Sequence, residues 1–267
     1  MNIFRKYTDC ELIQEYKRLQ NYVPKELLRN NIGYKCSNAF FQEERFASST
    51  GGKLSAISFW EQRKDKVLAY AETQQKGDLF RHVQFMNHSP SQFPPNVAIW
   101  FYKKFKATAV FDPFAGWGDR CLAAIASGVD YTGVDSNKRL RKCYKNMLKF
   151  FPHSSRAEIV FKPVEDVDFL SFDFDFVFSS PPFWNKKKKL IELYAGQRET
   201  RYDEFMVGIL APLIQYCKRK AWVCLYMPEH MAKDLETIGV KADLFFQYSG
   251  AGNKCKQTYM FFCYSSE

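Results

Sequence analysis

From about residue 97 onward, the chain alternates between short hydrophobic runs and longer amphipathic segments. The runs are rich in Val, Phe and Tyr, which is typical of buried strands, whereas the longer segments repeat apolar residues every three to four positions and predict helices. Because strands that alternate with helices form right-handed crossovers, this pattern predicts an α/β fold with a doubly wound, mostly parallel sheet of seven strands. The predicted strands are 109–112, 131–135, 158–161, 174–179, 221–227, 242–248 and 258–264, and the predicted helices are 97–105, 119–127, 138–151, 202–220 and 229–238.

The last two predicted strands have no helix between them. Their connection begins Ser249-Gly-Ala-Gly-Asn-Lys, a composition typical of a loop. Consecutive strands joined by a loop pair in antiparallel fashion. We therefore expect a hairpin at one edge of a Rossmann-like sheet, with the last strand reversed.

Residues 1–86 lack this alternation. We interpret them as a mostly helical or irregular N-terminal extension that precedes a core domain over 87–267. Thr8 and Glu11 are spaced as a capping box and predict a short amphipathic helix. Beyond that helix, we expect irregular chain over 21–52 and a second helix over 55–76.

The chain is basic, with 39 Lys and Arg against 29 Asp and Glu, a formal net charge of +10 and a pI near 9.1. This charge favours a polyanionic partner through counterion release and electrostatic steering. A basic protein without such a partner is an equally good interpretation of the charge alone. Candidates for nucleic-acid recognition in the N-terminal extension are Arg45, Lys53, Arg63, Lys64 and Lys66.

The distribution of apolar residues and cysteines bears on the compartment. No apolar run approaches the roughly 20 residues needed to span a bilayer, and the N-terminus lacks the hydrophobic stretch of a secretion signal. Eight cysteines include no C-x-x-C pair and no zinc-ligand spacing. We therefore expect mostly buried free thiols, no metal, no membrane contact and a reducing intracellular compartment, such as the cytoplasm, the nucleus or a virus-infected cell.

A glycine-containing loop follows the first predicted strand of the core, in the string Val110-Phe-Asp-Pro-Phe-Ala-Gly-Trp-Gly118. Its glycines let the backbone approach a ligand closely, and ligands of α/β sheets bind at the carboxyl ends of strands. The third glycine of a dinucleotide fingerprint is missing, because Cys121 stands in its place. Asp135 ends the second strand, where an acidic side chain can accept hydrogen bonds from both ribose hydroxyls. The combination favours a nucleoside cofactor without a pyrophosphate.

A second loop follows the fourth strand, in the string Phe176-Val-Phe-Ser-Ser-Pro-Pro-Phe183. An exocyclic amino group of a nucleobase is a poor nucleophile, because its lone pair is delocalised into the ring. An enzyme must hold its N–H groups with acceptors and orient it. Ser180 offers a side-chain oxygen and Pro181 a backbone carbonyl for this purpose. The ring of Phe183 can stack on the base, which is worth about 1–3 kcal/mol and offsets the cost of flipping a base out of a duplex.

Both strings resemble motifs of the DNA amino-methyltransferases, which methylate N6 of adenine or N4 of cytosine. Asp112-Pro-Phe-Ala-Gly-Trp-Gly is similar to their S-adenosylmethionine loop, and Ser180-Pro-Pro-Phe is similar to their catalytic motif. A third likeness lies in Asn87-His-Ser-Pro-Ser-Gln-Phe-Pro-Pro95. The resemblance covers residues 85–267 and implies the class I methyltransferase fold with S-adenosylmethionine as cofactor. The family usually has Ser or Thr where this chain has Trp117, a departure that leaves the backbone role of the loop intact.

The resemblance also implies which residues form the site. Asp135 would hold the ribose of the cofactor, and Glu165 or Asp166 would reach its adenine amino group. The implied cofactor-binding residues are Ser91, Phe93, Pro94, Asp112, Phe114, Ala115, Gly116, Gly118, Asp135, Ser136, Glu165 and Asp166, and the implied catalytic residues are Ser180, Pro181, Pro182 and Phe183.

The residues also bear on which nucleic acid and which of its bases is methylated. In the resembled family, Ser at position 180 is commoner among cytosine-N4 enzymes, so N4 of cytosine in DNA is favoured over N6 of adenine. Methylation at C5 of cytosine needs a Pro-Cys nucleophile, and the chain has no Pro-Cys dipeptide. Phosphate contacts are expected from the cations that follow the catalytic motif, Lys186, Lys187, Lys188, Lys189, Arg198 and Arg201.

Two alternatives stay open. An RNA base methyltransferase acting on guanine N2 or adenine N6 can use the same two motifs. A catalytically silent subunit could instead use the fold to grip nucleic acid for a partner. The spacing of the core elements leaves no room for an inserted recognition domain. We therefore expect sequence recognition to come from residues 1–86, from the loop 183–201, or from a homodimer or partner subunit.

Overall fold

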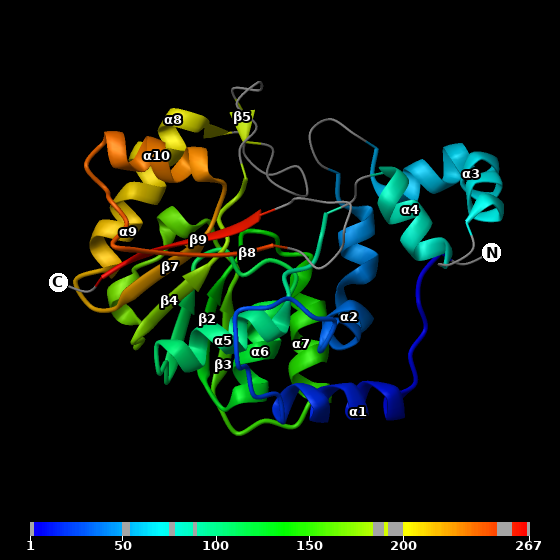
Figure 1. Ribbon diagram of the computed structural model, residues 1–267, viewed down its shortest axis with the longest axis horizontal. Helices are drawn as coiled ribbons and strands as arrows, with labels where there is room; N and C mark the ends of the chain where they lie inside the picture. The colour runs from blue at the N-terminus through cyan, green and yellow to red at the C-terminus, as the bar shows by residue number, and fades with distance from the viewer. Residues whose placement is uncertain are drawn as a thin grey trace.

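A seven-stranded mixed sheet forms the centre of the protein (Figure 1). The computed structural model describes residues 3–49, 54–74, 78–87, 90–183, 190–191, 200–249 and 258–265. The strands are β1 (Ala109–Asp112), β2 (Asp130–Val134), β3 (Ala157–Val160), β4 (Phe176–Ser179), β7 (Trp222–Tyr226), β8 (Leu244–Ser249) and β9 (Thr258–Tyr264). They lie in the order β3-β2-β1-β4-β7-β9-β8, and β9 runs antiparallel to both of its neighbours while the other pairs are parallel. The predicted doubly wound sheet with a reversed last strand is confirmed.

Helices cover both faces of the sheet (Figure 1). One face carries α5 (Pro95–Lys104), α6 (Asp119–Ser127) and α7 (Leu140–Phe150), and the other carries α8 (Tyr202–Phe205), a π-helical turn (Met206–Leu210), α9 (Ala211–Cys217) and α10 (Glu229–Thr237). Successive strand residues point to opposite faces: Val110 belongs to the first buried cluster and Phe111 to the second. Because both faces of the sheet are buried, the sequences of the strands are continuous hydrophobic runs. A short antiparallel pair, β5 (Leu190–Ile191) and β6 (Thr200–Arg201), lies outside the sheet.

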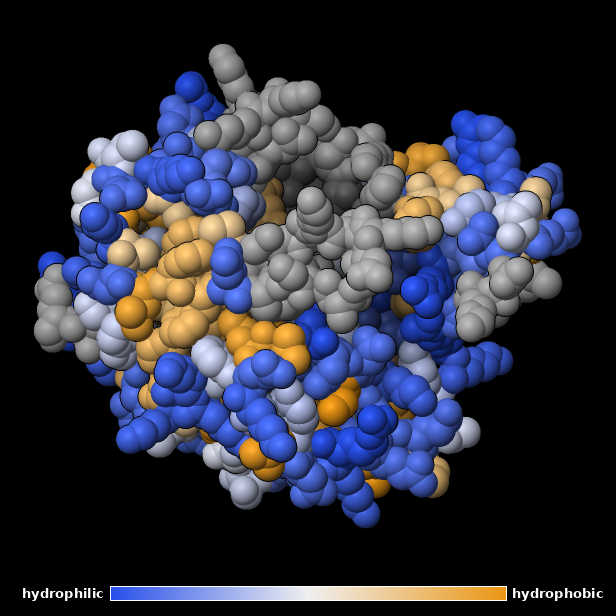
Figure 2. Space-filling view, viewed as in Figure 1, coloured by the Kyte–Doolittle hydropathy of each residue, from blue (hydrophilic) through white to orange (hydrophobic). Residues whose placement is uncertain are grey.

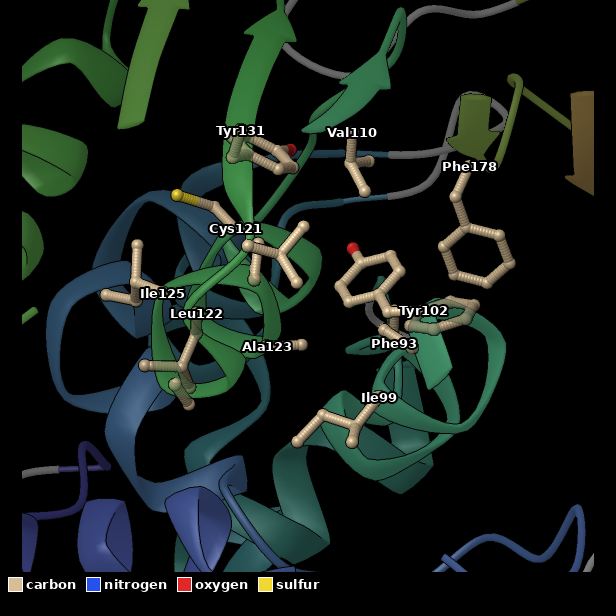
Figure 3. Close-up of a cluster of buried hydrophobic side chains, with 14 of the residues drawn as sticks. Phe93, Ile99, Tyr102, Val110, Cys121, Leu122, Ala123, Ile125, Tyr131 and Phe178 are labelled. Atoms are coloured by element: carbon tan, nitrogen blue, oxygen red, sulfur yellow. The ribbon is translucent and has the colours of Figure 1, made fainter. Parts of the chain in front are cut away.

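Aromatic residues fill the layer between the sheet and α5 and α6. Figure 3 shows Tyr102, Val110, Tyr131 and Phe178 gathered around this layer. The ring of Phe178 stacks on that of Phe101 with centroids 4.8 Å apart, and the hydroxyl of Tyr102 donates a hydrogen bond to the carbonyl of Arg120 at 3.0 Å. This packing fixes the start of α6 against the sheet.

Among the described residues, four further helices precede α5 and the sheet. They are α1 (Asp9–Gln20), α2 (Tyr34–Ala47), α3 (Ala56–Thr73) and α4 (Leu79–Asn87). The first two share the buried cluster of α5, α6 and α7, whereas α3 and α4 pack together around a smaller cluster that includes Trp60 and Phe80. The predicted capping box is present, because Glu11 N donates to Thr8 Oγ1 at 3.2 Å and Thr8 N donates to Glu11 Oε2 at 2.8 Å. The division at residue 86 stays a prediction.

The N-terminal segment also corrects two expectations. Residues 34–47 form α2 where irregular chain was predicted, because the helix begins at Gly33 without a side-chain cap and buries polar residues such as Asn38 and Gln42. Arg45, a predicted nucleic-acid contact, is fully buried in α2. Its guanidinium donates to the carbonyl of Pro90 at 2.9 Å and to Asn38 Oδ1 at 2.6 Å. Arg45 therefore has a structural role.

The cysteines depart in part from the expected free thiols. Cys36, Cys121 and Cys217 are buried and free, as predicted. Cys224 of β7 and Cys263 of β9, in contrast, occupy opposed register positions and form a disulfide. The expectation of free thiols is wrong for this pair, because the antiparallel pairing of β7 with β9 brings two distant cysteines face to face.

Within the described ranges, no helix combines the length and the apolar character that a membrane span requires. No group of His, Cys, Asp and Glu in those ranges could hold a metal ion. The face shown in Figure 2 is largely hydrophilic, with hydrophobic residues gathered over the sheet edge near β8, where Leu244 and Phe245 are exposed.

The two ends of α6 provide a matched test of packing. Gly118 before the helix and Gly128 after it both adopt a positive φ, of +76° and +70°. A Cβ at Gly118 would lie 2.6 Å from the ring of Phe41, which is fully buried, whereas a Cβ at Gly128 would meet nothing within 4 Å. We expect Gly128→Ala to lower the free energy of unfolding by about 1–2 kcal/mol and Gly118→Ala to lower it substantially more. Urea denaturation measures both, and equal losses would contradict the packing of α2 on this loop.

Candidate active site

A cavity of about 490 Å³ lies at the carboxyl ends of the parallel strands. Its walls come from the loops that follow β1, β2, β3 and β4, which is where ligands bind in open α/β sheets. The glycine loop (113–118) and the double-proline loop (180–183) therefore line the same space. The predicted residues that line it are Ser91, Phe93, Pro94, Phe114, Ala115, Gly116, Asp135, Ser136, Glu165, Ser180, Pro181, Pro182 and Phe183.

Some predicted site residues do not line the cavity. Asp112 is fully buried beneath it, Gly118 serves as the N-cap of α6, and Asp166 is exposed. Arg201 is exposed and pairs with Asp203 at 3.3 Å. The other predicted phosphate contacts, Lys186, Lys187, Lys188, Lys189 and Arg198, lie outside the described residues.

Asp112 is the centre of a buried hydrogen-bond network. Its carboxylate accepts Arg120 Nε at 2.7 Å and the hydroxyl of Tyr131 at 2.6 Å on one oxygen, and Ser179 Oγ at 2.6 Å on the other. Burial alone would lower the pKa of Arg120, but the Asp112 carboxylate outweighs it and raises that pKa. The guanidinium therefore stays charged, and its pair with Asp112 joins β1, β2, β4 and α6 under the floor of the cavity.

The glycine loop is held in place from both sides. Gly116 has a φ of +63°, a conformation that favours glycine. Its N–H donates to Asp135 Oδ2 at 2.8 Å, and its carbonyl accepts from the hydroxyl of Tyr144 at 3.0 Å. The guanidinium of Arg120 also donates to the carbonyl of Phe114. The loop thus presents its backbone to the cavity in a fixed shape.

Asp135 directly follows β2 and borders the cavity beside this loop. Its Oδ1 accepts the N–H of Asn137 at 2.8 Å, so each carboxylate oxygen already holds one backbone donor and keeps a further lone pair. Burial raises the pKa of Asp135 to about 6, although the two backbone N–H groups oppose this shift. At neutral pH the group is therefore mostly an acceptor-only carboxylate.

The two serines at the end of β4 have different surroundings. Ser179 is fully buried, and its hydroxyl donates to Asp112 while accepting the N–H of Phe114 at 3.1 Å. Ser180 lines the cavity. The sequence predicted a role for Ser180 alone, and the structure assigns Ser179 to the framework of the site.

An aromatic wall stands beside the double-proline loop. Phe183 is 45% exposed, which leaves one part of its ring accessible. It meets Tyr226 edge to face with centroids 5.1 Å apart, and Tyr226 lies 5.8 Å from Phe93 in the same manner. All three residues line the cavity. Tyr226 was not predicted, because it ends a different strand and belongs to no recognisable motif.

The N-terminal segment completes the cavity. Asp119, at the start of α6, is buried. Its carboxylate accepts hydrogen bonds from the hydroxyl of Ser37 in α2 and from the N–H of Phe93 at 3.1 Å, and so ties α2 to the lining of the cavity. Burial raises the pKa of Asp119 to about 6. Arg29 lines the cavity from the same segment. Sequence reasoning missed both contributions, since they depend on contacts between residues far apart in the chain.

Comparisons with known proteins add little to this geometry. No family model and no curated protein matches the chain. Similar solved structures include the hMettl16 catalytic domain in complex with a 3′UTR hairpin, at 14% identity, with 67% of this chain and 72% of that one covered and a TM-score of 0.48. Another is human methyltransferase 10 domain containing protein, at 11% identity, with 88% of this chain and 100% of that one covered and a TM-score of 0.44. A third is an rRNA methylase from Streptococcus thermophilus, at 10% identity, with 67% of this chain and 99% of that one covered and a TM-score of 0.43. Residue roles do not follow from likenesses of this size.

Removal of the central carboxylate tests the network. Asp112→Ala leaves the buried guanidinium of Arg120 without its partner, and breaking a buried pair in this way costs about 3–5 kcal/mol of unfolding free energy. The control is Asp203→Ala, which removes an exposed ion pair with Arg201, and such pairs contribute little. Chemical denaturation compares the two variants. A loss for Asp112→Ala as small as that of the control would contradict the role of the network.

Proposed function

We propose that this protein is a methyltransferase that transfers a methyl group from S-adenosylmethionine to an exocyclic amino group of a nucleobase. The observation that carries the proposal is the shared cavity: the glycine loop after β1 and the Ser180–Phe183 loop after β4 line one space. A methyl donor and its acceptor must meet for transfer to occur, and two loops on one cavity can hold them together.

The residues of the cavity fit S-adenosylmethionine by their chemistry. Asp135 supplies carboxylate oxygens for a ribose diol, and Glu165 supplies an acceptor on the loop after β3. Val134, Leu140 and Val164 add apolar walls for a purine. Gly116 leaves the loop backbone open to a ligand. Bound in this place, the cofactor would supply an electrophilic methyl group on a sulfonium sulfur.

The double-proline loop fits the acceptor. Ser180 and the carbonyl of Pro181 offer oxygens to the N–H groups of an amino substituent, which directs the nitrogen lone pair toward the methyl group. Phe183 has an accessible ring for stacking, and Tyr226 supports that ring from its edge. In the proposed transfer, the nitrogen would form the new N–C bond as the C–S bond of the donor breaks, and the surplus N–H proton would pass to solvent.

The choice of nucleic acid rests on the sequence. The net charge of +10 favours a polyanion, and Ser180 in place of an acid favours N4 of cytosine in DNA. Guanine N2 or adenine N6 in RNA is the second candidate, because the same two loops suit any exocyclic amino group. Some of the similar solved structures are named as RNA-modifying or RNA-binding proteins, so RNA belongs in the first assay.

The direct test is product analysis. The purified protein is incubated with labelled S-adenosylmethionine and with DNA or RNA, and the nucleic acid is digested to nucleosides. N4-methylcytosine in DNA is the expected product, and an N-methylated base in RNA alone would assign the second candidate. Cofactor binding without any methylated product would contradict the proposed activity.

Two substitutions test the acceptor loop. Ser180→Ala removes one acceptor for the amino group and should lower kcat about 100-fold. Phe183→Ala removes the stacking ring and should lower kcat/KM for nucleic acid about 5- to 100-fold. Both variants should bind S-adenosylhomocysteine as the wild type does, which calorimetry checks. Undiminished turnover in both variants would remove the catalytic assignment.

The raised pKa of Asp135 predicts a pH dependence. The ribose hydroxyls donate to a carboxylate, and Asp135 loses that form as the pH falls through about 6. Affinity for S-adenosylhomocysteine should therefore be highest above pH 7 and about tenfold lower at pH 5. Asp119 titrates in the same range, so the matched variant Asp135→Asn isolates the effect. It should bind weakly at every pH, and an unchanged pH profile in this variant would exclude Asp135 as the cause.

A further inference from the structure

The segment between α1 and α2 contributes Arg29 to the lining of the cavity, although it lies outside residues 85–267, where the motif resemblance is found. Asn30 N donates to Asn96 Oδ1 at 3.2 Å, and Asn96 Nδ2 donates to the carbonyl of Leu28. These two bonds flank Arg29 and fix its backbone beside the first turn of α5. A second contact lies at Gly33, where a Cβ would stand 3.0 Å from Pro95.

Arg29 is directed from this segment to the cavity by a chain of contacts. Its guanidinium carbon lies 5.6 Å from the centroid of Tyr34, and the carbonyl of Tyr34 accepts a hydrogen bond from Gln92 Nε2 at 3.4 Å. Gln92 precedes Phe93, and Arg29, Gln92 and Phe93 all line the cavity. The side chain of Arg29 is half-buried, so an anion near it would be partly shielded from water.

The cations of the cavity divide between its two ends. Lys138 and Lys162 lie near Asp135 and Glu165, on the loops after β2 and β3, which the proposed function gives to the ribose and the adenine. The methionine end then extends toward the glycine loop and Phe93. Arg120 is at that end, where its guanidinium holds the network beneath the glycine loop through Asp112 and Phe114. Arg29 is the second guanidinium among the described residues that line the cavity.

We propose that Arg29 binds the carboxylate of the methionine end of the cofactor, so that the N-terminal segment supplies one subsite of the cofactor cavity. This inference rests on the proposed function. A guanidinium suits the role, because its planar fork donates two parallel hydrogen bonds to a carboxylate. The first turn of α5 adds to the attraction, since a helix N-terminus carries partial positive charge.

Two ligands that differ in the carboxylate provide the test. S-adenosylhomocysteine carries the amino-acid group, whereas 5′-methylthioadenosine keeps the adenosine and the sulfur without it. We expect Arg29→Ala to lower the affinity for S-adenosylhomocysteine about 10- to 100-fold, which is the size of a charge-assisted interaction. The affinity for 5′-methylthioadenosine should stay within about twofold of the wild type. Calorimetry on the full chain measures both, and retained binding of the second ligand shows that the variant is folded.

Two further variants sharpen the comparison. Arg29→Lys keeps the charge but lacks the planar pair of N–H donors, so its affinity for S-adenosylhomocysteine should lie between those of the wild type and Arg29→Ala. Lys25→Ala removes an exposed cation from the same segment, outside the cavity lining, and should change neither affinity. If Arg29→Ala lowers the affinity for both ligands to the same degree, or for neither, the role of Arg29 is overturned while the proposed function stands. A wild-type chain that binds neither ligand would overturn the proposed cofactor site, and the Arg29 subsite with it.

Discussion

Asp112 and Arg120 form a buried ion pair, and the shape of the candidate site depends on it. The carboxylate also accepts hydrogen bonds from Tyr131 on β2 and Ser179 on β4, while the guanidinium also donates to the carbonyl of Phe114 in the glycine loop. One charged pair thus connects three adjacent strands, β2, β1 and β4. A buried charge without a partner is costly, so neither loop can move far from the network without a large loss of stability.

The sheet also explains why two motifs separated by about 60 residues in the chain can line one cavity. Strands β1 and β4 are direct parallel neighbours, with Val110 opposite Phe176. Their carboxyl ends therefore meet at one edge of the sheet, and the loops that follow them line one cavity. The proposed methyl transfer needs this proximity more than any single side chain. The aromatic wall of Phe93, Tyr226 and Phe183 then extends the cavity toward an accessible ring.

The sheet and the two motifs were predictable because they depend on local patterns. Hydrophobic runs separated by amphipathic segments indicated the strands, and α6 has the predicted bounds of 119–127. Contacts between distant segments left no such signal. The burial of Arg45, the placement of Arg29 at the cavity, and the pairing of Cys224 with Cys263 all depend on how separate elements pack. Asp112 shows the same limit: the motif marked it as important, but only its partners show that it supports the loop from below.

A crystal structure with S-adenosylhomocysteine bound decides whether the two loops share one site for donor and acceptor. We expect the ribose at Asp135 and the sulfur between Gly116 and the loop of Ser180 and Phe183, facing the accessible ring. A ligand bound elsewhere, or one whose sulfur points away from the double-proline loop, would contradict the shared cavity as the place of methyl transfer.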